Sequence, residues 1–314
     1  MHANDFQSAI TSTRRAVADY DQLAASASLT RFTSDSPFAQ FVFTPRATLL
    51  GTVDRLNNAA NTMQTQTAAL IDAMETSFAN DFRTDGGHWM VQVDDPAAIN
   101  ELVSRYGKQR SYQTLQEHLD DLKSLYNLEQ RVRQQVADSI AAVHAGETNA
   151  AQIAVPTEAG AMDAAGWLGT AQSVASTLGV QVKQTSVYGC PGADDNGDDN
   201  ADMVIGFFCG GSQAGRNEVN MLTTHPEWPA VERSPLLVDY TKHELAHRSI
   251  MIVCGTTEPE IAANRTEAVT NSYAVQFLGA SRERIAGSQQ GLAAYAMDAQ
   301  SDQIAQSIHN GTCA

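Results

Sequence analysis

Apolar residues recur at helical spacing through the first half of the chain. From about Arg46 to Asp81 they alternate steps of four and three residues, the heptad pattern of a helix with one packing seam. The seam consists of Leu49, Val53, Leu56, Ala60, Met63, Thr67, Leu70 and Met74. Similar stripes predict a second long helix from about Ser111 to Val143 and a shorter one from Asp5 to about Ala25. Because such helices bury their stripes against one another, we expect an elongated antiparallel helical bundle or coiled-coil hairpin.

The helical pattern weakens at two places. The stretch from Thr84 to Pro96 is the least regular part of this half, and His88 within it is expected to be a loop residue rather than a ligand. Gly146 and the polar residues after it, and then Pro156, break the period again. We therefore expect a helical bundle or stalk domain in residues 1–150 and a second domain in residues 151–314.

Shorter elements are expected in the second half. A helix from Ala161 to about Leu178 comes first. Alternating or apolar runs then predict strands at Val180–Tyr188, Met203–Phe208 and Glu218–Thr223. Apolar residues on both sides of residues 243–247 predict a further helix, which continues to Val253 ahead of a turn at Gly255. The fold class predicted for the chain is α+β, mostly helical, with a small mixed sheet in the second domain.

The sequence His243-Glu244-Leu245-Ala246-His247 lies in that further helix. Residues four apart on a helix lie about 40° apart around its axis, so both imidazoles face the same way with the carboxylate beside them. Two neutral imidazoles on one face suit a zinc ion, and the neighbouring carboxylate can act as a general base towards water. His243 and His247 are therefore candidate ligands, and Glu244 is the candidate base. The alternative is a buried, hydrogen-bonded histidine pair with a surface glutamate.

A third ligand is expected from the next helical segment. Glu267 lies twenty residues after His247, and an antiparallel return after Gly255 would bring it level with the histidines. Over roughly Val182 to Phe277, this spacing resembles that of the gluzincins, the thermolysin-like zinc metallopeptidases with a histidine pair and a downstream glutamate. The resemblance implies one zinc ion, a compact zincin-like domain without a large C-terminal lobe, and hydrolysis of a peptide or protein substrate. If Glu218–Thr223 is the edge strand beside the metal, we expect an extended peptide to pair with it.

Two details depart from the family pattern or leave it incomplete. Gluzincins commonly carry an acidic residue four positions after the ligand glutamate, where it orients a ligand histidine, and this chain has Asn271 there. An amide oxygen still accepts the imidazole proton but carries no charge, so weaker support of the histidine is expected. The transition-state oxyanion also needs a hydrogen-bond donor, for which Tyr240, Tyr273 and His309 are the candidates. His309 would be drawn towards the site by a disulfide near the carboxyl terminus.

Charge and hydropathy limit the partners. A formal net charge of −16 argues against nucleic acid and anionic membrane surfaces, since both attract a basic face. No run of 18 apolar residues occurs, so no membrane span is expected.

The start of the chain lacks a signal-peptide pattern and is typical of a trimmed sequence, which leaves a removed membrane anchor or signal open. Self-association through the heptad seam is also open, because a seam closes either within one chain or between two.

Cysteine usage indicates the compartment. Cys190, Cys209, Cys254 and Cys313 lack the close spacing of a zinc ribbon. Of three possible pairings we prefer Cys190 with Cys209, which would close a hairpin, and Cys254 with Cys313, which would tie the carboxyl terminus to the histidine helix. Two disulfides would indicate an oxidising, extracytoplasmic location, secreted or attached to the cell envelope. Four buried free thiols are the alternative. The function that competes with a peptidase is a cell-envelope interaction or scaffold protein with a degenerate or inactive zinc site.

An acidic stretch lies between the first two cysteines. Oxygen-bearing side chains at Asp194, Asn196, Asp198 and Asp202 alternate as in a calcium-binding loop. The glycine of that loop is misplaced, however, and no bidentate glutamate follows at the twelfth position. We expect a solvated hairpin turn here, and a Ca²⁺ site is the weaker alternative.

Overall fold

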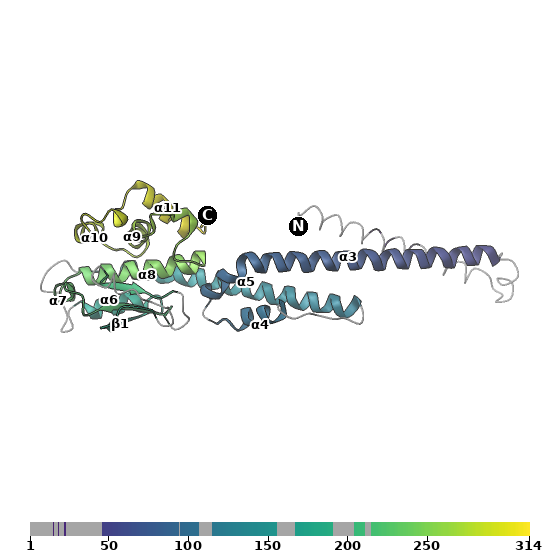
Figure 1. The fold of residues 1–314 in the computed structure, drawn as a ribbon, viewed down its shortest axis with the longest axis horizontal. Helices are drawn as coiled ribbons and strands as arrows, with labels where there is room; N and C mark the ends of the chain where they lie inside the picture. The colour runs from purple at the N-terminus through teal and green to yellow at the C-terminus, as the bar shows by residue number, and fades with distance from the viewer. Residues whose placement is uncertain are drawn as a thin grey trace. The chain divides into compact units, whose positions relative to one another are not determined.

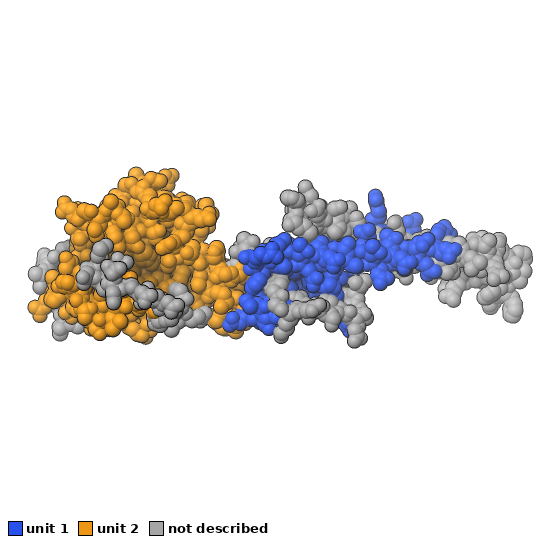
Figure 2. All heavy atoms as spheres, in the orientation of Figure 1, with its two compact units in different colours: residues 1–84, 100–130 blue, residues 85–99, 131–314 orange. Residues whose placement is uncertain are grey.

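The computed structural model describes residues 15, 18, 22, 46–93, 95–106, 115–155, 167–190, 204–210 and 215–314. These residues are mostly helical with one small mixed sheet (Figure 1), so the fold is of the α+β class that the sequence predicts. Contacts divide the chain into two compact units (Figure 2). The helical unit comprises residues 1–84 and 100–130, and the C-terminal unit comprises residues 85–99 and 131–314.

Parts of three helices form the helical unit: α3 (Arg46–Gln92), α4 (Ala97–Tyr106) and α5 (Leu115–Gln152). Its buried apolar side chains are Ile71, Phe78, Leu102, Leu122, Leu125 and Leu128. Of the α5 stripe predicted from the sequence, Leu122, Leu125 and Val132 are buried, whereas Val136 and Ile140 are partly exposed. On α3 the buried face is shifted by one position, since Ile71 is buried while Leu70 and Met74 are partly exposed.

The long helices α3 and α5 run in the same direction within this unit. Glu75 Oε1 lies 2.9 Å from His118 Nε2, and further along both helices the rings of Phe78 and Tyr126 have centroids 5.8 Å apart. The expected antiparallel hairpin is therefore wrong for these two helices. The reason is α4, a helix that was not predicted from the sequence although Ile99 and Leu102 form its buried face. The chain returns along α4 between α3 and α5, so α5 becomes parallel to α3.

Two expected interruptions in the helices do not occur. α3 continues through His88 to Gln92, so His88 is helical rather than part of a loop. α5 continues through Gly146 to Gln152. A Cβ at Gly146 would lie 2.7 Å from the carbonyl oxygen of Thr177, so this glycine permits close packing within the C-terminal unit instead of ending the helix. Residues 131–150 accordingly belong to the C-terminal unit by their contacts, which differs from the expected division at residue 150.

Some expectations fall on residues outside the described part of the chain. The helix from Asp5 to Ala25 is represented only by residues 15, 18 and 22, which are helical. The acidic stretch with Asp194, Asn196, Asp198 and Asp202 lies wholly outside it. Both stay predictions.

The sheet of the C-terminal unit has three short strands, β1 (Gln181–Thr185), β2 (Gly206–Phe208) and β3 (Glu218–Leu222), in the order β1-β3-β2. β1 is parallel to β3, and β2 is antiparallel to it. The strand expected at the edge is thus the central one. Neighbours in space cannot be read from strand order in sequence, because β3 pairs with both preceding strands.

The histidine helix is the centre of the C-terminal unit. In Figure 1, α8 (Leu236–Cys254) lies between a layer formed by the sheet and α6 (Leu168–Ser176) and a layer formed by α9 (Thr266–Phe277) and α11 (Ala299–His309). Shorter elements are α7 (Trp228–Val231), η2 (Glu260–Ala262), α10 (Arg282–Ser288) and η3 (Ala293–Tyr295). Because both faces of α8 are covered, it lacks a polar outer face, as expected of a central helix.

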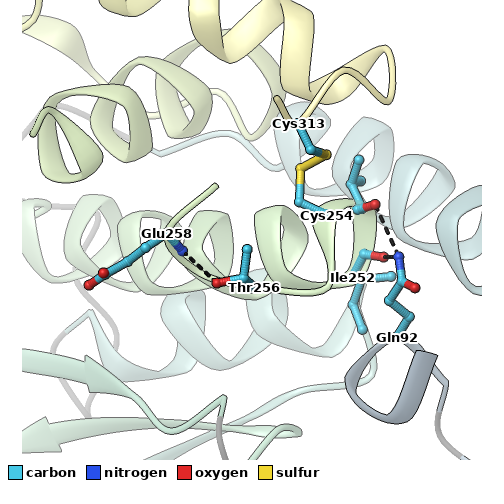
Figure 3. Close-up of a disulfide and its surroundings, with 7 residues drawn as sticks. Gln92, Ile252, Cys254, Thr256, Glu258 and Cys313 are labelled. Atoms are coloured by element: carbon cyan, nitrogen blue, oxygen red, sulfur yellow. Dashed lines mark hydrogen bonds between the residues drawn. A yellow bond between two sulfur atoms is a disulfide. The ribbon is translucent and has the colours of Figure 1, made fainter. Parts of the chain in front are cut away.

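The two disulfides join the pairs preferred from the sequence, Cys190 with Cys209 and Cys254 with Cys313. Figure 3 shows the second at the carboxyl end of α8, where Gln92 Nε2 also donates hydrogen bonds of 3.1 Å to the carbonyl oxygens of Ile252 and Val253. Two disulfides are compatible with an oxidising, extracytoplasmic environment. None of the helices that the structure describes combines the length and apolar character of a membrane span.

Candidate metal centre

Buried polar residues of helix α8 fix its rotation about the helix axis. Asp239, which is 0% exposed, pairs with the guanidinium of Arg284 and accepts a 2.9 Å hydrogen bond from the backbone N–H of Ser281. Lys242 Nζ donates a 2.9 Å hydrogen bond to the carbonyl oxygen of Gly279. These contacts tie one side of α8 to the start of α10 and the end of α9. The two histidines then face α9.

His243, His247 and Glu267 converge, although Glu267 comes from a different helix. Glu267 Oε2 lies 3.1 Å from His243 Nε2 and 3.5 Å from His247 Nε2. The imidazole centroids are 4.8 Å apart and the rings are nearly perpendicular, at 88°. All three potential ligand atoms lie within 4.8 Å of one another. The turn at Gly255, which has φ of 73°, ends α8 and permits this return of the chain.

The donor atoms fit a zinc ion. Ligand atoms about 2.0–2.2 Å from a tetrahedral zinc are about 3.3–3.5 Å from one another, close to the separations of 3.1 and 3.5 Å found here. Two imidazoles and one carboxylate are also the ligands of many catalytic zinc sites, which leave the fourth position for water or substrate. Within the described part of the chain, no fourth histidine, cysteine or carboxylate belongs to this group.

Glu244 lies beside these three side chains, against strand β2. It is 6% exposed. A Cβ at Gly206 would lie 3.2 Å from Glu244 Cγ and 3.3 Å from its Oε1. Only a glycine at this position of β2 leaves room for the carboxylate without displacing it. Sequence reasoning missed Gly206, although a glycine inside the apolar run Ile205-Gly206-Phe207-Phe208 is a sign of such close approach.

Burial and neighbouring charges set the protonation of this cluster. Burial by itself would lower the pKa of His243, but Glu267, Glu244 and Asn271 favour its charged form and raise the pKa to about 9. Burial works against the charge of Glu267 as well, yet the hydrogen bonds and charges of both histidines lower its pKa. Burial raises the pKa of Glu244, opposed by His243 and His247. Glu267 is therefore favoured as a carboxylate, and its negative charge stabilises a positive charge beside it.

Each of the two histidines has a partner on its Nδ1 nitrogen. His243 Nδ1–H donates to Asn271 Oδ1 at 2.7 Å. Thr270 Oγ1, which donates to Thr266 O, lies 3.4 Å from His247 Nδ1 and is placed to accept from it. These contacts engage both Nδ1 atoms and leave both Nε2 atoms to face Glu267, the arrangement that a shared metal ion would need.

Asn271 is itself fully hydrogen-bonded. Its amide nitrogen donates to Gln289 Oε1 at 2.7 Å and to the carbonyl oxygen of Tyr295 at 3.0 Å. These two acceptors orient the amide, so its oxygen must face His243.

Two of the expected oxyanion donors, His309 and Tyr273, lie elsewhere, and a tyrosine that was not predicted is at the site. His309 packs on Phe277 and approaches Glu147 to 3.2 Å, in a separate cluster. Tyr273 donates to that same Glu147. Tyr295 was not predicted; its ring centroid is 6.2 Å from that of His243. Burial, and then the charges of Glu267 and Glu244, raise the pKa of Tyr295 to about 12, so its phenol is a protonated donor at neutral pH. No local pattern marks it, since it lies in a short 3₁₀ turn far along the chain.

Comparison with protein families, with curated proteins and with solved structures found no match to this chain.

Proposed function

We propose that the protein is a zinc-dependent peptidase of gluzincin type. The observation that supports this is the convergence of His243, His247 and Glu267 with the buried carboxylate of Glu244 next to them. The three would hold one zinc ion. When bound, zinc acts as a Lewis acid on the scissile carbonyl and lowers the pKa of water from about 15.7 to about 7.

Glu244 is the general base in this proposal. Its carboxylate takes a proton from the attacking water and then delivers it to the leaving amine, so no net proton stays on the enzyme. Burial raises its pKa, which makes it a stronger base than an exposed glutamate. The backbone of Gly206 covers one side of it and limits competing contact with solvent.

Tyr295 is the donor for the developing oxyanion in this proposal. A phenol donates one hydrogen bond and, with its raised pKa, keeps its proton throughout the pH range in which Glu244 acts. Donors of this kind contribute about 10²–10³ in kcat. Asn271 holds both this tyrosine's backbone and His243, so it positions donor and ligand together.

Strand β2 is the proposed binding edge for an extended peptide substrate. Within the described residues it pairs only with β3, and its Gly206 adjoins Glu244. A peptide adding to the other edge of β2 by main-chain hydrogen bonds would place a scissile bond beside the base. The two disulfides support an extracytoplasmic site of action.

The test uses the full chain, loaded with zinc, on casein and a peptide library. Glu244→Gln keeps the shape of the side chain but removes the base, so we expect hydrolysis to fall at least about 100-fold with unchanged zinc content. Glu258→Gln, an exposed residue beyond α8, is the matched control and should retain activity. Bound zinc without hydrolysis of any substrate by the wild type would contradict the peptidase and favour an envelope scaffold protein.

A further inference from the structure

A second group of metal-ligating side chains lies in the C-terminal unit, apart from the first. His144 and Glu147 are three residues apart on α5, and His309 is the last residue of α11. One imidazole nitrogen from each histidine and one carboxylate oxygen of Glu147 lie within 4.8 Å of one another. Residues three apart on a helix share a face, and α11 brings the third side chain to that face.

Two atoms of this group are buried without a hydrogen bond. Glu147 is 1% exposed. Its Oε1 accepts a 2.8 Å hydrogen bond from Tyr273, whereas Oε2 lies 3.2 Å from His309 Nε2 but is not hydrogen-bonded by any described residue. His144 Nε2 is likewise buried and lacks a partner in the described structure. An unsatisfied buried polar atom lowers the stability of the fold by about 1–3 kcal/mol, and by more when it is charged. A ligand that bound both atoms would remove this penalty.

None of the described neighbours supplies a fixed positive charge to this carboxylate. Its described neighbours are the hydroxyls of Tyr273 and Ser249 and the imidazole of His309, and of these only Tyr273 donates a hydrogen bond with good geometry. Burial raises the pKa of Glu147 to about 7, although both hydroxyls oppose this, and burial lowers the pKa of His309 to about 4. Neutral imidazoles offer lone pairs, and a divalent cation would compensate the buried carboxylate.

We propose that His144, Glu147 and His309 form a second site for a divalent transition metal, with zinc as the expected ion. Imidazole and carboxylate are ligands that zinc accepts, and the hydrogen bond from Tyr273 orients Glu147 in the manner usual for such carboxylates. The ion would join α5 to α11 and, through Tyr273, to α9, the helix that carries Glu267. Its role is therefore to stabilise the scaffold of the first site.

The rings show what must move on binding. His309 is stacked between Phe277, with centroids 3.9 Å apart, and His144, with centroids 4.0 Å apart. Two nearly parallel rings cannot aim both lone pairs at one ion. The ring of His144, which is only partly buried, must turn out of the stack, while Glu147 and His309 already lie 3.2 Å apart.

The experiment is a titration of the chelator-treated full chain with ZnCl₂ by calorimetry, with metal content measured after dialysis. We expect two equivalents for the wild type and one for His309→Gln, for His144→Gln and for His247→Gln. His88→Gln changes an exposed histidine of α3 outside both groups and should still bind two. Circular dichroism checks the fold of each variant, and His144→Gln decides if His309→Gln does not fold.

The outcomes separate this site from the first. One result is a single equivalent of zinc that is lost in His309→Gln and His144→Gln but kept in His247→Gln. It would support the second site and contradict zinc binding at the proposed peptidase centre. A single equivalent lost in His247→Gln and kept in the other two overturns the second site and leaves the peptidase proposal standing. Equal stoichiometry and affinity in the wild type, His144→Gln and His309→Gln also overturns it.

Discussion

The amide nitrogen of Asn271 donates a 3.0 Å hydrogen bond to the carbonyl oxygen of Tyr295. Through the same side chain the oxygen accepts from His243 Nδ1 at 2.7 Å. One amide therefore joins a candidate zinc ligand to the turn that carries a candidate oxyanion donor. This contact also explains why an asparagine suits a position where gluzincins commonly have an acidic residue: a carboxylate could support the histidine but could not donate to Tyr295.

Asn271→Asp should therefore destabilise the protein. The new carboxylate keeps the bond from His243 but opposes the carbonyl oxygen of Tyr295, which loses its donor. We expect a loss of about 1–3 kcal/mol in the free energy of unfolding, measured by urea denaturation with a chelator present. Asn57→Asp, at an exposed position of α3, is the control. If the two variants were equally stable, the donor role of Asn271 would be refuted.

Tyr295→Phe should lower turnover without loss of metal. Removing the phenol hydroxyl takes away the proposed oxyanion donor, so kcat/KM should fall about 10²–10³-fold. Zinc content and thermal unfolding should be unchanged, because the backbone carbonyl that binds Asn271 stays in place. Tyr126→Phe, an exposed tyrosine of the helical unit (45% exposed), should have no effect. Full activity in Tyr295→Phe would show that Tyr295 is not the hydrogen-bond donor to the oxyanion.

Gly206→Ala should impair the base rather than the fold. The added methyl would lie 3.2 Å from Glu244 Cγ and should push the carboxylate away from its position, with a loss of up to about 100-fold in kcat. Gly87→Ala is the matched change on α3, where an added Cβ meets no atom within 4 Å. That control should gain up to about 1 kcal/mol in stability, as helical glycines do. Steady-state kinetics and urea denaturation of both variants distinguish the two effects.

Asp298→Asn should reduce the pH dependence of stability in acid. Asp298 caps α11, where Oδ1 accepts a 2.8 Å hydrogen bond from Ser301 N, and it also pairs with Arg265. Hydrogen bonds from Arg265 and Ser301 lower its pKa to about 2 from 3.8. Since the pKa is lower in the folded state, its contribution is complete above about pH 4 and is lost as the pH falls towards 2.

The difference in melting temperature between the wild type and Asp298→Asn should accordingly shrink between pH 5 and pH 2.5. Asp138→Asn, exposed on α5, is the control, and its difference from the wild type should not follow this course. If the melting temperature of Asp298→Asn differed from that of the wild type by the same amount at every pH, the charge of Asp298 would not contribute to stability.

The elements that the sequence predicts well are those set by local periodicity. The helix with His243 and His247 and the α5 stripe at Leu122 and Leu125 follow from side chains that repeat every three to four residues. The spacing from His247 to Glu267 spans only the connection between the consecutive helices α8 and α9, which includes η2, so it too is nearly local. Because the short helix α4 was overlooked, the predicted direction of α5 relative to α3 was wrong.

By itself, then, the sequence determined the longer helices, the α+β class and two histidines on one helical face, because these depend on neighbours within a few turns. Only the tertiary structure decided that β3 is the central strand and β2 adjoins Glu244, that Asn271 reaches Tyr295, and that His309 meets Glu147 instead of the first cluster. Each of these pairs brings together segments far apart in the chain. Their contact depends on how whole helices and strands pack, and no short-range pattern of residues records that packing.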